Sequence, residues 1–548
     1  MILVQGTNTN RFLYCSGKGR LILILFLLAG LELAARPDKY EVTNIRAKDA
    51  GACCQYKALS YLITDYGAVA DGKTDNTIAI QRAIDEAAKN GGGIVLVPAG
   101  DFVTGVLQLK SNIELKLARQ SRLLASINRA DYGPGKASAL IVATGVQHVA
   151  ITGNGTIDGR AKLLLEDIYR MLNAGTLKDS EWQVYNDWHQ MRPEENNRPH
   201  LIDFKNCTNI IIKNITIRDG LCWIQDYRDC SDIIIDSIIV HSNTFLNNDG
   251  IDITDSKNVR LTNSSFNVAD DGICLKSSSP NSLCENIYIA NCKVRSSASA
   301  FKMGTASRGG FKNITVRDIN IYDTYRSAIA IETVDGGDIE NVDIRNVTAR
   351  NTGNAIFIRL GQRNQRAAPG TLHGIYISDV KVSVPAGKPD AGYSMEGPEL
   401  QYPHNVFPSS ITGIPGHPVE NVVLDNIDII YEGGASKNKA YFALDSLEHQ
   451  TENIKEYPEF SMFGELPVWG FFVRHAQGIT MKNVKLSYSK SDFRTACVFD
   501  DVHRLKITGL EISKAESTPV ILLKKVTGDS LEQIKTPKNI ENPISVLQ

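Results

Sequence analysis

The sequence predicts an all-β protein, a right-handed parallel β-helix that begins with a short capping helix. One phrase recurs along the chain: a polar residue, an alternating apolar run, Asn or Asp, and a second alternating run, as in residues 209–217 and 313–321. Alternation with a period of two indicates strands, and a repeat of 20 to 50 residues indicates a solenoid. No helix fits between consecutive strands, so each coil should stack in parallel on the next at about 4.8 Å.

The first apolar residue of each phrase sets the register that we expect between coils. From Ile210 to Val342 these residues are 23, 26, 28, 27 and 28 positions apart. One coil cannot bury its apolar face alone, so stacking must stabilise the fold. A leucine-rich horseshoe is the main competing solenoid, but its Leu-rich consensus and its helix in each repeat are missing. The register residues are Val149, Ile210, Ile233, Val259, Ile287, Ile314, Val342, Ile375, Val422, Ile479 and Leu505.

The N-terminus has the pattern of a secretory signal peptide, which we assign to residues 1–35. The apolar run from Leu21 to Leu31 is too short to span a bilayer comfortably, and basic residues precede it while small residues follow it. An N-terminal anchor is the alternative. We expect a secreted or periplasmic protein with no membrane span after signal removal, and residues 36–548 as a single parallel β-helix domain. The flanking residues are Arg11, Lys18, Arg20, Ala34 and Ala35.

An amphipathic helix is expected to plug the N-terminal end of the solenoid, within a cap of about residues 60–110. Apolar residues recur at helical spacing between Ile78 and Lys89, and three glycines follow. Longer gaps in the repeat predict long loops at about 160–200, 361–420 and 431–475. Long insertions on a solenoid usually frame its binding face. The helix face consists of Ile80, Ala83, Ile84 and Ala87, and the first insertion contains Trp182 and Trp188.

Composition excludes several classes of protein. The formal net charge is -2, whereas nucleic-acid binders usually carry a basic excess. No CxxC or His-spaced pair indicates a zinc site, and we expect no metal and no cofactor. Cys207, Cys230 and Cys292 occupy a similar point of the repeat, which predicts stacked free thiols in the core rather than a disulfide framework. The sequence sets no oligomeric state.

Two consecutive coils carry a cluster of carboxylates. Residues 247–252 and 269–274 share an Asp-Gly-Ile phrase 22 residues apart, which stacks Asp249 on Asp271 and leaves Asp270 beside them. Carboxylates this close repel, so one pKa should rise while another stays low. Glycoside hydrolysis needs one carboxylic acid and one carboxylate. We therefore predict these three aspartates to be catalytic, although an Asp-rich turn ladder bonded to backbone amides is the structural alternative.

The alternation of the neighbouring strands places further charges on the same outer face. Inward apolar pairs on five successive coils leave the residue between or after them pointing outward. Such a face is often merely solvated, but its mixed charges beside three aspartates favour a sugar-binding cleft. The predicted substrate-binding residues are Asp252, Lys276, Lys302, Glu332 and Arg359.

From about Tyr61 to about Gly361 the chain resembles glycoside hydrolase family 28, the polygalacturonases and their relatives. Residues 65–72 resemble an entry segment shared by many pectin-active β-helices. Residues 247–249 match the family's Asn-x-Asp, and Asp270-Asp271 match its Asp-Asp. The resemblance implies that Asp270 is the general acid, that Asp249 and Asp271 hold and deprotonate the water, that the reaction inverts the anomeric centre, and that no metal is needed.

The sequence departs from this family at two motifs. Ser299 stands where Gly-His-Gly has its histidine, and Ala330 and Glu332 replace the basic residues of the Arg-Ile-Lys that binds the substrate carboxylate. Lys302 or Arg359 could replace the lost cation, or the sugar there could be neutral or branched. The predicted function is hydrolysis of a pectic carbohydrate of galacturonide or rhamnogalacturonan type. A polysaccharide lyase using the aspartates for calcium, and a non-catalytic carbohydrate-binding β-helix, are the alternatives.

Overall fold

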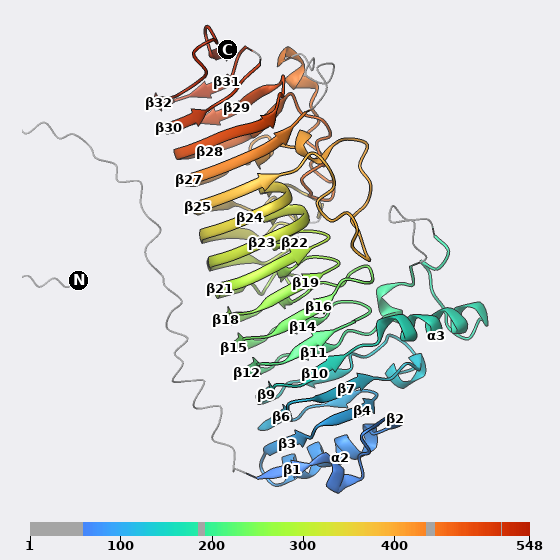
Figure 1. The fold of residues 1–548 in the computed structure, drawn as a ribbon. Helices are drawn as coiled ribbons and strands as arrows, with labels where there is room; N and C mark the ends of the chain where they lie inside the picture. Colours follow the sequence, from blue (N-terminus) through green and yellow to red (C-terminus); the bar gives the residue numbers. More distant parts are fainter. Residues whose placement is uncertain (1–58, 185–191, 366, 435–443, 517, 548) are drawn as a thin grey trace, which may run out of the picture.

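The computed structural model describes residues 59–184, 192–365, 367–434, 444–516 and 518–547. It is a parallel β-helix whose coils stack from the N-terminal to the C-terminal end (Figure 1), as the repeat predicts. The expected signal peptide, residues 1–35, and Trp188 lie outside the described residues. In the described part of the chain, no helix is long and apolar enough to cross a membrane.

The strands stack in three columns, and the long ones pass from one column into the next. The first column contains β1 (Ser60–Leu62), β3 (Gly93–Val97), β6 (Ile113–Leu117), β9 (Gln147–Gly153), β12 (Thr208–Lys213), β15 (Ser231–Asp236), β18 (Lys257–Thr262), β21 (Cys284–Ser296), β23 (Gly310–Thr333), β24 (Asp338–Leu360), β25 (Leu372–Val384), β27 (Val419–Gly433), β28 (Val468–Lys490), β30 (Lys506–Ile512) and β32 (Ser530–Glu532). The second contains β2 (Asp71–Asp75), β4 (Gly100–Thr104), β7 (Ser121–Ala125), β10 (Thr156–Asp158), β13 (Thr216–Arg218), β16 (Ile239–Ser242) and β19 (Ser265–Val268), and continues in β21. The third contains β5 (Leu107–Gln108), β8 (Ile141–Thr144), β11 (Ile202–Lys205), β14 (Gln225–Arg228), β17 (Asp252–Thr254), β20 (Ile273–Ser277), β22 (Phe301–Ser307), β26 (Ser409–Thr412), β29 (Thr495–His503), β31 (Ile521–Thr527) and β33 (Ile544–Leu547).

The pairing register is the one that the sequence repeat predicts. Val149 pairs with Ile210 and Ile210 with Ile233. Each further register residue pairs with the next one along the chain, as far as Ile479. These marker side chains are buried and form the interior of the solenoid. The register is strongly specified because a slip of one residue would turn every apolar side chain to the outside.

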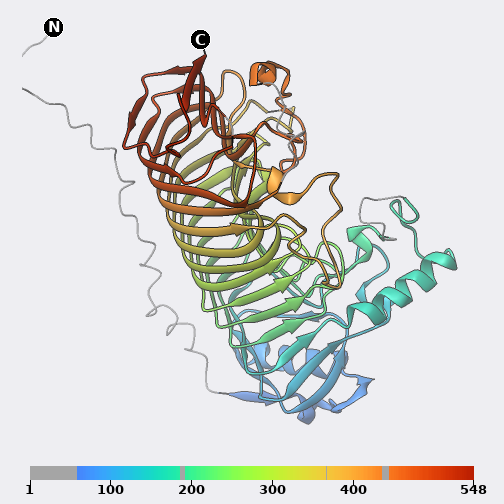
Figure 2. The ribbon, with the colours of Figure 1, turned by 45° about the horizontal axis from the view of Figure 1, so that its top comes forward.

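Helix α2 (Thr77–Lys89) caps the N-terminal end, and its buried residues are the four that the sequence predicts. A second helix, α3 (Ala161–Asn173), lies where we expected a loop. The sequence contained the signal for this helix, because the residues that it buries recur at helical spacing: Ala161, Leu164, Ile168 and Leu172. Figures 1 and 2 both show α3 projecting from the same side of the solenoid as the segments between β25 and β27.

Two sequence-based expectations need correction. The stretch 361–420 is not one loop, because it contains β25 and β26. Cys292 does not stack with Cys207 and Cys230. Cys207 and Cys230 stack on each other at one corner of the coil, whereas Cys292 stacks on Ser264 at another corner. The error arose because both corners begin with a similar polar-apolar phrase. All seven described cysteines are free and buried.

Candidate active site

The three aspartates meet where two coils turn into the third column. Asp249 precedes β17, and Asp270 and Asp271 precede β20 on the next coil. Pairing of Asp252 with Cys274 stacks the two Asp-Gly-Ile phrases as predicted. One carboxylate oxygen from each aspartate lies within 4.8 Å of the others. Asp249 and Asp271 are buried, whereas Asp270 is partly exposed, so it is the member of the cluster that an incoming molecule reaches first.

Local backbone packing explains why this turn has its sequence. A Cβ on Gly250 would lie 2.5 Å from the carbonyl oxygen of Gly272, and a Cβ on Gly272 would lie 2.7 Å from that of Ala300. Both distances are too short for any side chain, so each aspartate is followed by glycine. The Asn248 side chain donates to the carbonyls of Gly220 (2.8 Å) and Cys222 (3.1 Å) and thereby fixes the turn that carries Asp249.

Two lysines on consecutive coils form ion pairs with this cluster and with Asp252. Lys276 Nζ lies 3.0 Å from Asp249 Oδ2 and 2.5 Å from Asp252 Oδ1, and Lys302 Nζ lies 3.0 Å from Asp271 Oδ2. Lys302 is 2% exposed and Asp252 is fully buried. Burial alone would lower the pKa of each lysine, but the adjacent carboxylates raise it well above its ordinary value. Both lysines are therefore charged partners of the aspartates.

Burial and charge separate the pKa values of the three aspartates. Burial raises the pKa of Asp249 well above its ordinary value. Burial and the neighbouring Asp271 raise the pKa of Asp270. Burial acts on Asp271 in the same direction, but Lys302 and Arg326 outweigh it and lower the Asp271 pKa. The pKa values of Asp249 and Asp270 are thus displaced upward and that of Asp271 downward, and a separation of this kind suits acid–base chemistry.

Asp271 is also the most firmly held of the three. The Ser299 backbone N–H donates to Asp271 Oδ1 at 3.1 Å, while Lys302 occupies Oδ2. Ser299 lies on the next coil in the same column. At the position of the expected histidine the chain therefore supplies a backbone donor, and no ring reaches the cluster from there.

The predicted substrate-binding residues have different surroundings. Their inward neighbours are buried, as alternation predicts, but the outward charges are not solvated. Glu332 is 2% exposed and accepts a hydrogen bond from the Thr305 hydroxyl at 3.3 Å. Burial raises the pKa of Glu332 to about 7. Arg359 donates to the carbonyls of Gly413 (3.0 Å) and Glu452 (2.6 Å), so it joins two segments of the chain.

Three residues around the cluster were missed by the sequence analysis. Arg326 ion-pairs with Glu459 at 3.2 Å, and its charge acts on Asp270 and Asp271. Tyr457 accepts a hydrogen bond from Lys302 Nζ at 3.0 Å and is 46% exposed. Trp223 lies on the coil before Asp249, with Lys276 Nζ 3.7 Å from its ring centroid. Arg326 could have been found from the stacking register, because Arg326 stacks on Ala298, which in turn stacks on Asp270. Tyr457 lies outside the repeat, so no register could have predicted its position.

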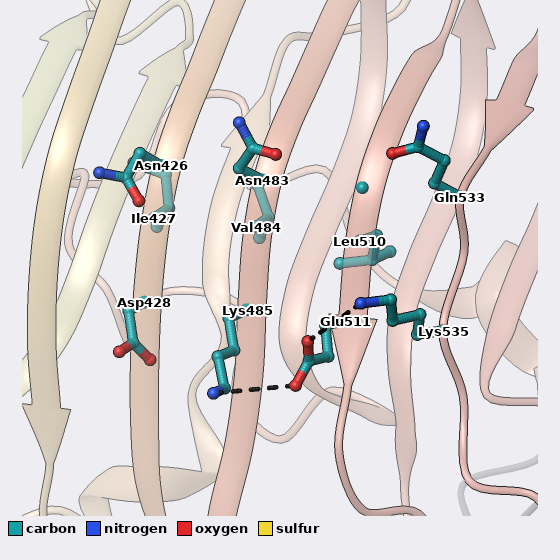
Figure 3. A pocket seen from close by; sticks show the side chains of 11 residues that line it. Asn426, Ile427, Asp428, Asn483, Val484, Lys485, Leu510, Glu511, Gln533 and Lys535 are labelled. Atoms are coloured by element: carbon teal, nitrogen blue, oxygen red, sulfur yellow. Dashed lines mark ion pairs between the residues drawn. The ribbon is translucent and has the colours of Figure 1, made fainter.

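A separate hollow of about 320 Å³ lies over β27, β28, β30 and the segment that follows β32, near the C-terminal end. Figure 3 shows its polar side chains in two rows, with Glu511 between Lys485 and Lys535. The two ion pairs are 3.7 Å and 3.9 Å long and exposed. This hollow has no cluster of close carboxylates and is distinct from the aspartate site.

A parallel β-helix with three close carboxyl groups on the outer face of its coils is an arrangement suited to cleavage of a carbohydrate. The chain belongs to glycosyl hydrolases family 28: the family model matches residues 91–395, more than half of the 548 residues. A second model, "Rhamnogalacturonase A/epimerase, pectate lyase-like", matches residues 62–118.

Several similar proteins are named for polygalacturonide cleavage. A probable polygalacturonase from Vitis vinifera is 28% identical over 325 residues, which cover 56% of this chain and 58% of the relative. An exo-poly-α-D-galacturonosidase from Dickeya chrysanthemi is 28% identical over 252 residues, 38% of this chain and 41% of the relative. The chain thus matches about half of the length of these relatives. A hyperthermoactive exopolygalacturonase from Thermotoga maritima has the same fold (TM-score 0.56, 21% identity, 80% of this chain and 93% of that chain).

Proposed function

We propose that the protein is a secreted enzyme that hydrolyses glycosidic bonds of a pectic polysaccharide or oligosaccharide, of galacturonide or rhamnogalacturonan type. The observation that carries this proposal is the group of three aspartates within 4.8 Å with pKa values displaced in opposite directions. Family membership and the names of the relatives support the substrate class. The pattern of residues 1–35 supports export.

Asp270 is the proposed general acid. It is the partly exposed member of the cluster, so a glycosidic oxygen can reach it. Its pKa is raised by burial and by Asp271, which keeps a proton on it at a higher pH than an ordinary aspartate allows. A carboxylic acid with these properties protonates the leaving oxygen as the bond to the sugar breaks.

Asp271 is the proposed base, and Asp249 positions the water. The two were equivalent on the sequence, but only Asp271 has a lowered pKa and is therefore ionised when Asp270 is protonated. Lys302 would keep Asp271 ionised, and Lys276 would orient Asp249. This assigns the two lysines to holding the aspartates rather than to contact with the substrate. Asp252 and Arg359 are assigned to structure, because their charges are used within the protein.

Inversion is part of the proposal because the resemblance to the family implies it. Inverting enzymes leave room for a water between their carboxyl groups, whereas one oxygen of each aspartate here lies within 4.8 Å of the others. The water must then be held beside the cluster, by Asp249 and Asp271 together, rather than between two distant carboxyls. Proton NMR of the first-formed anomer decides between the outcomes.

Exo action is favoured over endo action, since segments from both sides reach the aspartate-bearing coils. Arg198, after α3, donates to the carbonyl of Leu246 at 2.8 Å. From the C-terminal side Tyr457 reaches Lys302 and Glu459 reaches Arg326. Segments on both sides of the aspartates would close the groove, so that only the end of a substrate chain could enter it. Rapid loss of viscosity with mid-length fragments at the start of digestion would refute exo action.

A lyase is the less favoured alternative. It would need the aspartates to bind calcium, but Lys276 and Lys302 already form ion pairs with three of the four candidate ligands. The experiment that tests the proposed function incubates the protein with defined pectic oligosaccharides. New reducing ends without the absorbance of an unsaturated uronide are expected. An unsaturated product would assign the protein to the lyases, and no product from any pectic substrate would reject both activities.

A further inference from the structure

The two basic residues that the sequence offered as partners for a substrate carboxylate are both occupied within the protein. Lys302 is 2% exposed and pairs with Asp271 at 3.0 Å. Arg359 is 1% exposed, and its guanidinium donates to the carbonyls of Gly413 and Glu452. A uronate that approached either side chain would have to break these contacts first. A cation for an acidic substrate must therefore come from another part of the third column.

A pocket of about 450 Å³ lies at the end of that column, next to the row of outward residues that contains Glu332 and Arg359. Its walls are the ends of β20, β22, β23 and β24 and the turns that follow them, on four successive coils. Arg363 follows Arg359 by four positions, about 13 Å along an extended chain. A sugar chain bound across the aspartate-bearing coils can therefore place a neighbouring unit at this pocket. The lining residues are Ser278, Ala306, Arg308, Asp335, Arg363 and Asn364.

Arg308 is an exposed cation in the wall of this pocket. Its backbone N–H donates to the carbonyl of Ser277 at 2.7 Å. Among the described residues, no carboxylate or carbonyl accepts a hydrogen bond from its guanidinium. A guanidinium presents five N–H donors in a planar fork that matches a carboxylate, so this side chain is available to a bound anion.

The carboxylates that border the pocket are held by other donors of the protein. Asp335 accepts two hydrogen bonds from Arg363, at 3.1 and 2.7 Å, and one from the Ser307 backbone N–H at 3.3 Å. Asp255 accepts from backbone N–H groups in the turn that follows β20. Two arginines and two aspartates balance in charge, so an anion would be held by direct contact with the Arg308 fork rather than by a net positive field.

We propose that this pocket is a uronate subsite, in which Arg308 donates to the carboxylate of a sugar unit near the cleaved bond, with Arg363 and Asn364 beside it. The inference rests on the proposed function and deepens it, because it assigns recognition of the substrate charge to named residues. That recognition would then lie in the turns after the strands, whereas the cations on the strands themselves hold the protein together.

The first experiment compares a free-acid oligogalacturonide with its methyl ester of equal length. Arg308→Gln should raise KM for the free acid about three- to tenfold with kcat nearly unchanged, and should change KM for the ester less than about twofold. Arg308→Lys keeps the charge and should restore part of the loss. Arg119→Gln, which changes an exposed arginine on an N-terminal coil, is the matched control and should alter neither KM.

The second experiment measures the same contact without turnover. Calorimetry gives Kd for the free-acid oligomer with Asp270→Asn and with the double variant Asp270→Asn, Arg308→Gln, and Kd should rise by the factor seen in KM. An unchanged Kd, or an equal rise of KM for acid and ester, would overturn the inference and leave the proposed function intact. Absence of hydrolysis by the wild-type protein, with a Kd that still depends on Arg308, would reject the proposed function and support the uronate subsite. Absence of measurable binding would overturn the inference.

Discussion

The aspartate site and the two exposed rows of polar side chains in Figure 3 both arise from the stacking of coils, but they differ in burial. In both, outward polar residues of successive coils stack at the spacing of parallel strands. Around the aspartates the ion pairs are 2.5–3.0 Å long and their side chains are at most 11% exposed. In the exposed rows the Lys485–Glu511 pair is 3.7 Å long, with side chains 52% and 40% exposed.

This difference shows that stacking brings charged side chains together. Burial beneath segments that are distant in the sequence then strengthens their interactions and shifts their pKa values. Exposed pairs are screened by water and are typically worth about 0–1 kcal/mol. Buried charges interact strongly and shift one another's pKa, as the opposite displacement of Asp270 and Asp271 illustrates. The predictions below test the contrast, from the largest effect to the smallest.

Asp270→Asn should reduce kcat about 10²–10⁴-fold, because an amide keeps the shape of the carboxyl but cannot donate a proton to the leaving oxygen. Asp428→Asn is the matched control, since it makes the same exchange in the rows of Figure 3, and it should leave kcat unchanged. Steady-state kinetics on the preferred oligosaccharide, with circular dichroism to check the fold, measures both. Near-normal turnover by Asp270→Asn would remove Asp270 as the acid.

Lys302→Met should lower the free energy of unfolding by about 3–5 kcal/mol, because it leaves the Asp271 carboxylate buried without its partner. It should also raise the apparent pKa of the acidic limb of the pH–rate profile, since Lys302 lowers the Asp271 pKa. Lys485→Met, the exposed counterpart, should change the unfolding free energy by less than about 1 kcal/mol. Urea denaturation compares them, and similar losses for the two variants would contradict the role of burial.

Activity and stability should depend on pH through different groups. Activity should fall at high pH, as Asp270 loses its proton, and at low pH, as Asp271 gains one. The folded pKa of Asp252 is about 7, above its ordinary 3.8, because burial disfavours its charge. A raised carboxyl pKa stabilises the fold below pH 3.8, and that contribution is lost as pH rises from 3.8 to about 7.

Asp252→Asn mimics the protonated form and should remove this share of the pH dependence. Urea unfolding of wild type and variant at pH 4, 5.5 and 7 gives the comparison. A difference between the two proteins that does not change with pH would show that Asp252 keeps one protonation state throughout.

Glu511→Gln should have the smallest effect, a change of less than about 0.5 kcal/mol in unfolding free energy and none in activity. Its two lysine contacts are long and solvent-exposed, and surface substitutions of this kind are usually near neutral. Thermal denaturation in low and high salt measures it. A loss above about 1 kcal/mol would mean that the exposed rows contribute to stability as buried pairs do.

The sequence by itself determined the fold, the register and the three aspartates. Each coil contacts mainly the coil before and after it, so the apolar period fixes which residues stack, and Asp249 meets Asp271 for the same reason that Ile233 meets Val259. The α2 cap followed from its own helical period. These features depend on local pattern and on neighbours one repeat away.

Only the tertiary structure decided the environment of those aspartates. Lys302 meets Tyr457 across 155 residues and Arg359 meets Glu452 across 93, and no period in the sequence relates them. These contacts come from the segment between β27 and β28, which follows no repeat. The segment converts an outward, nominally solvated row of charges into a buried one. Burial then sets the protonation states, because the free energy of a charge depends on its surroundings rather than on its position in the sequence.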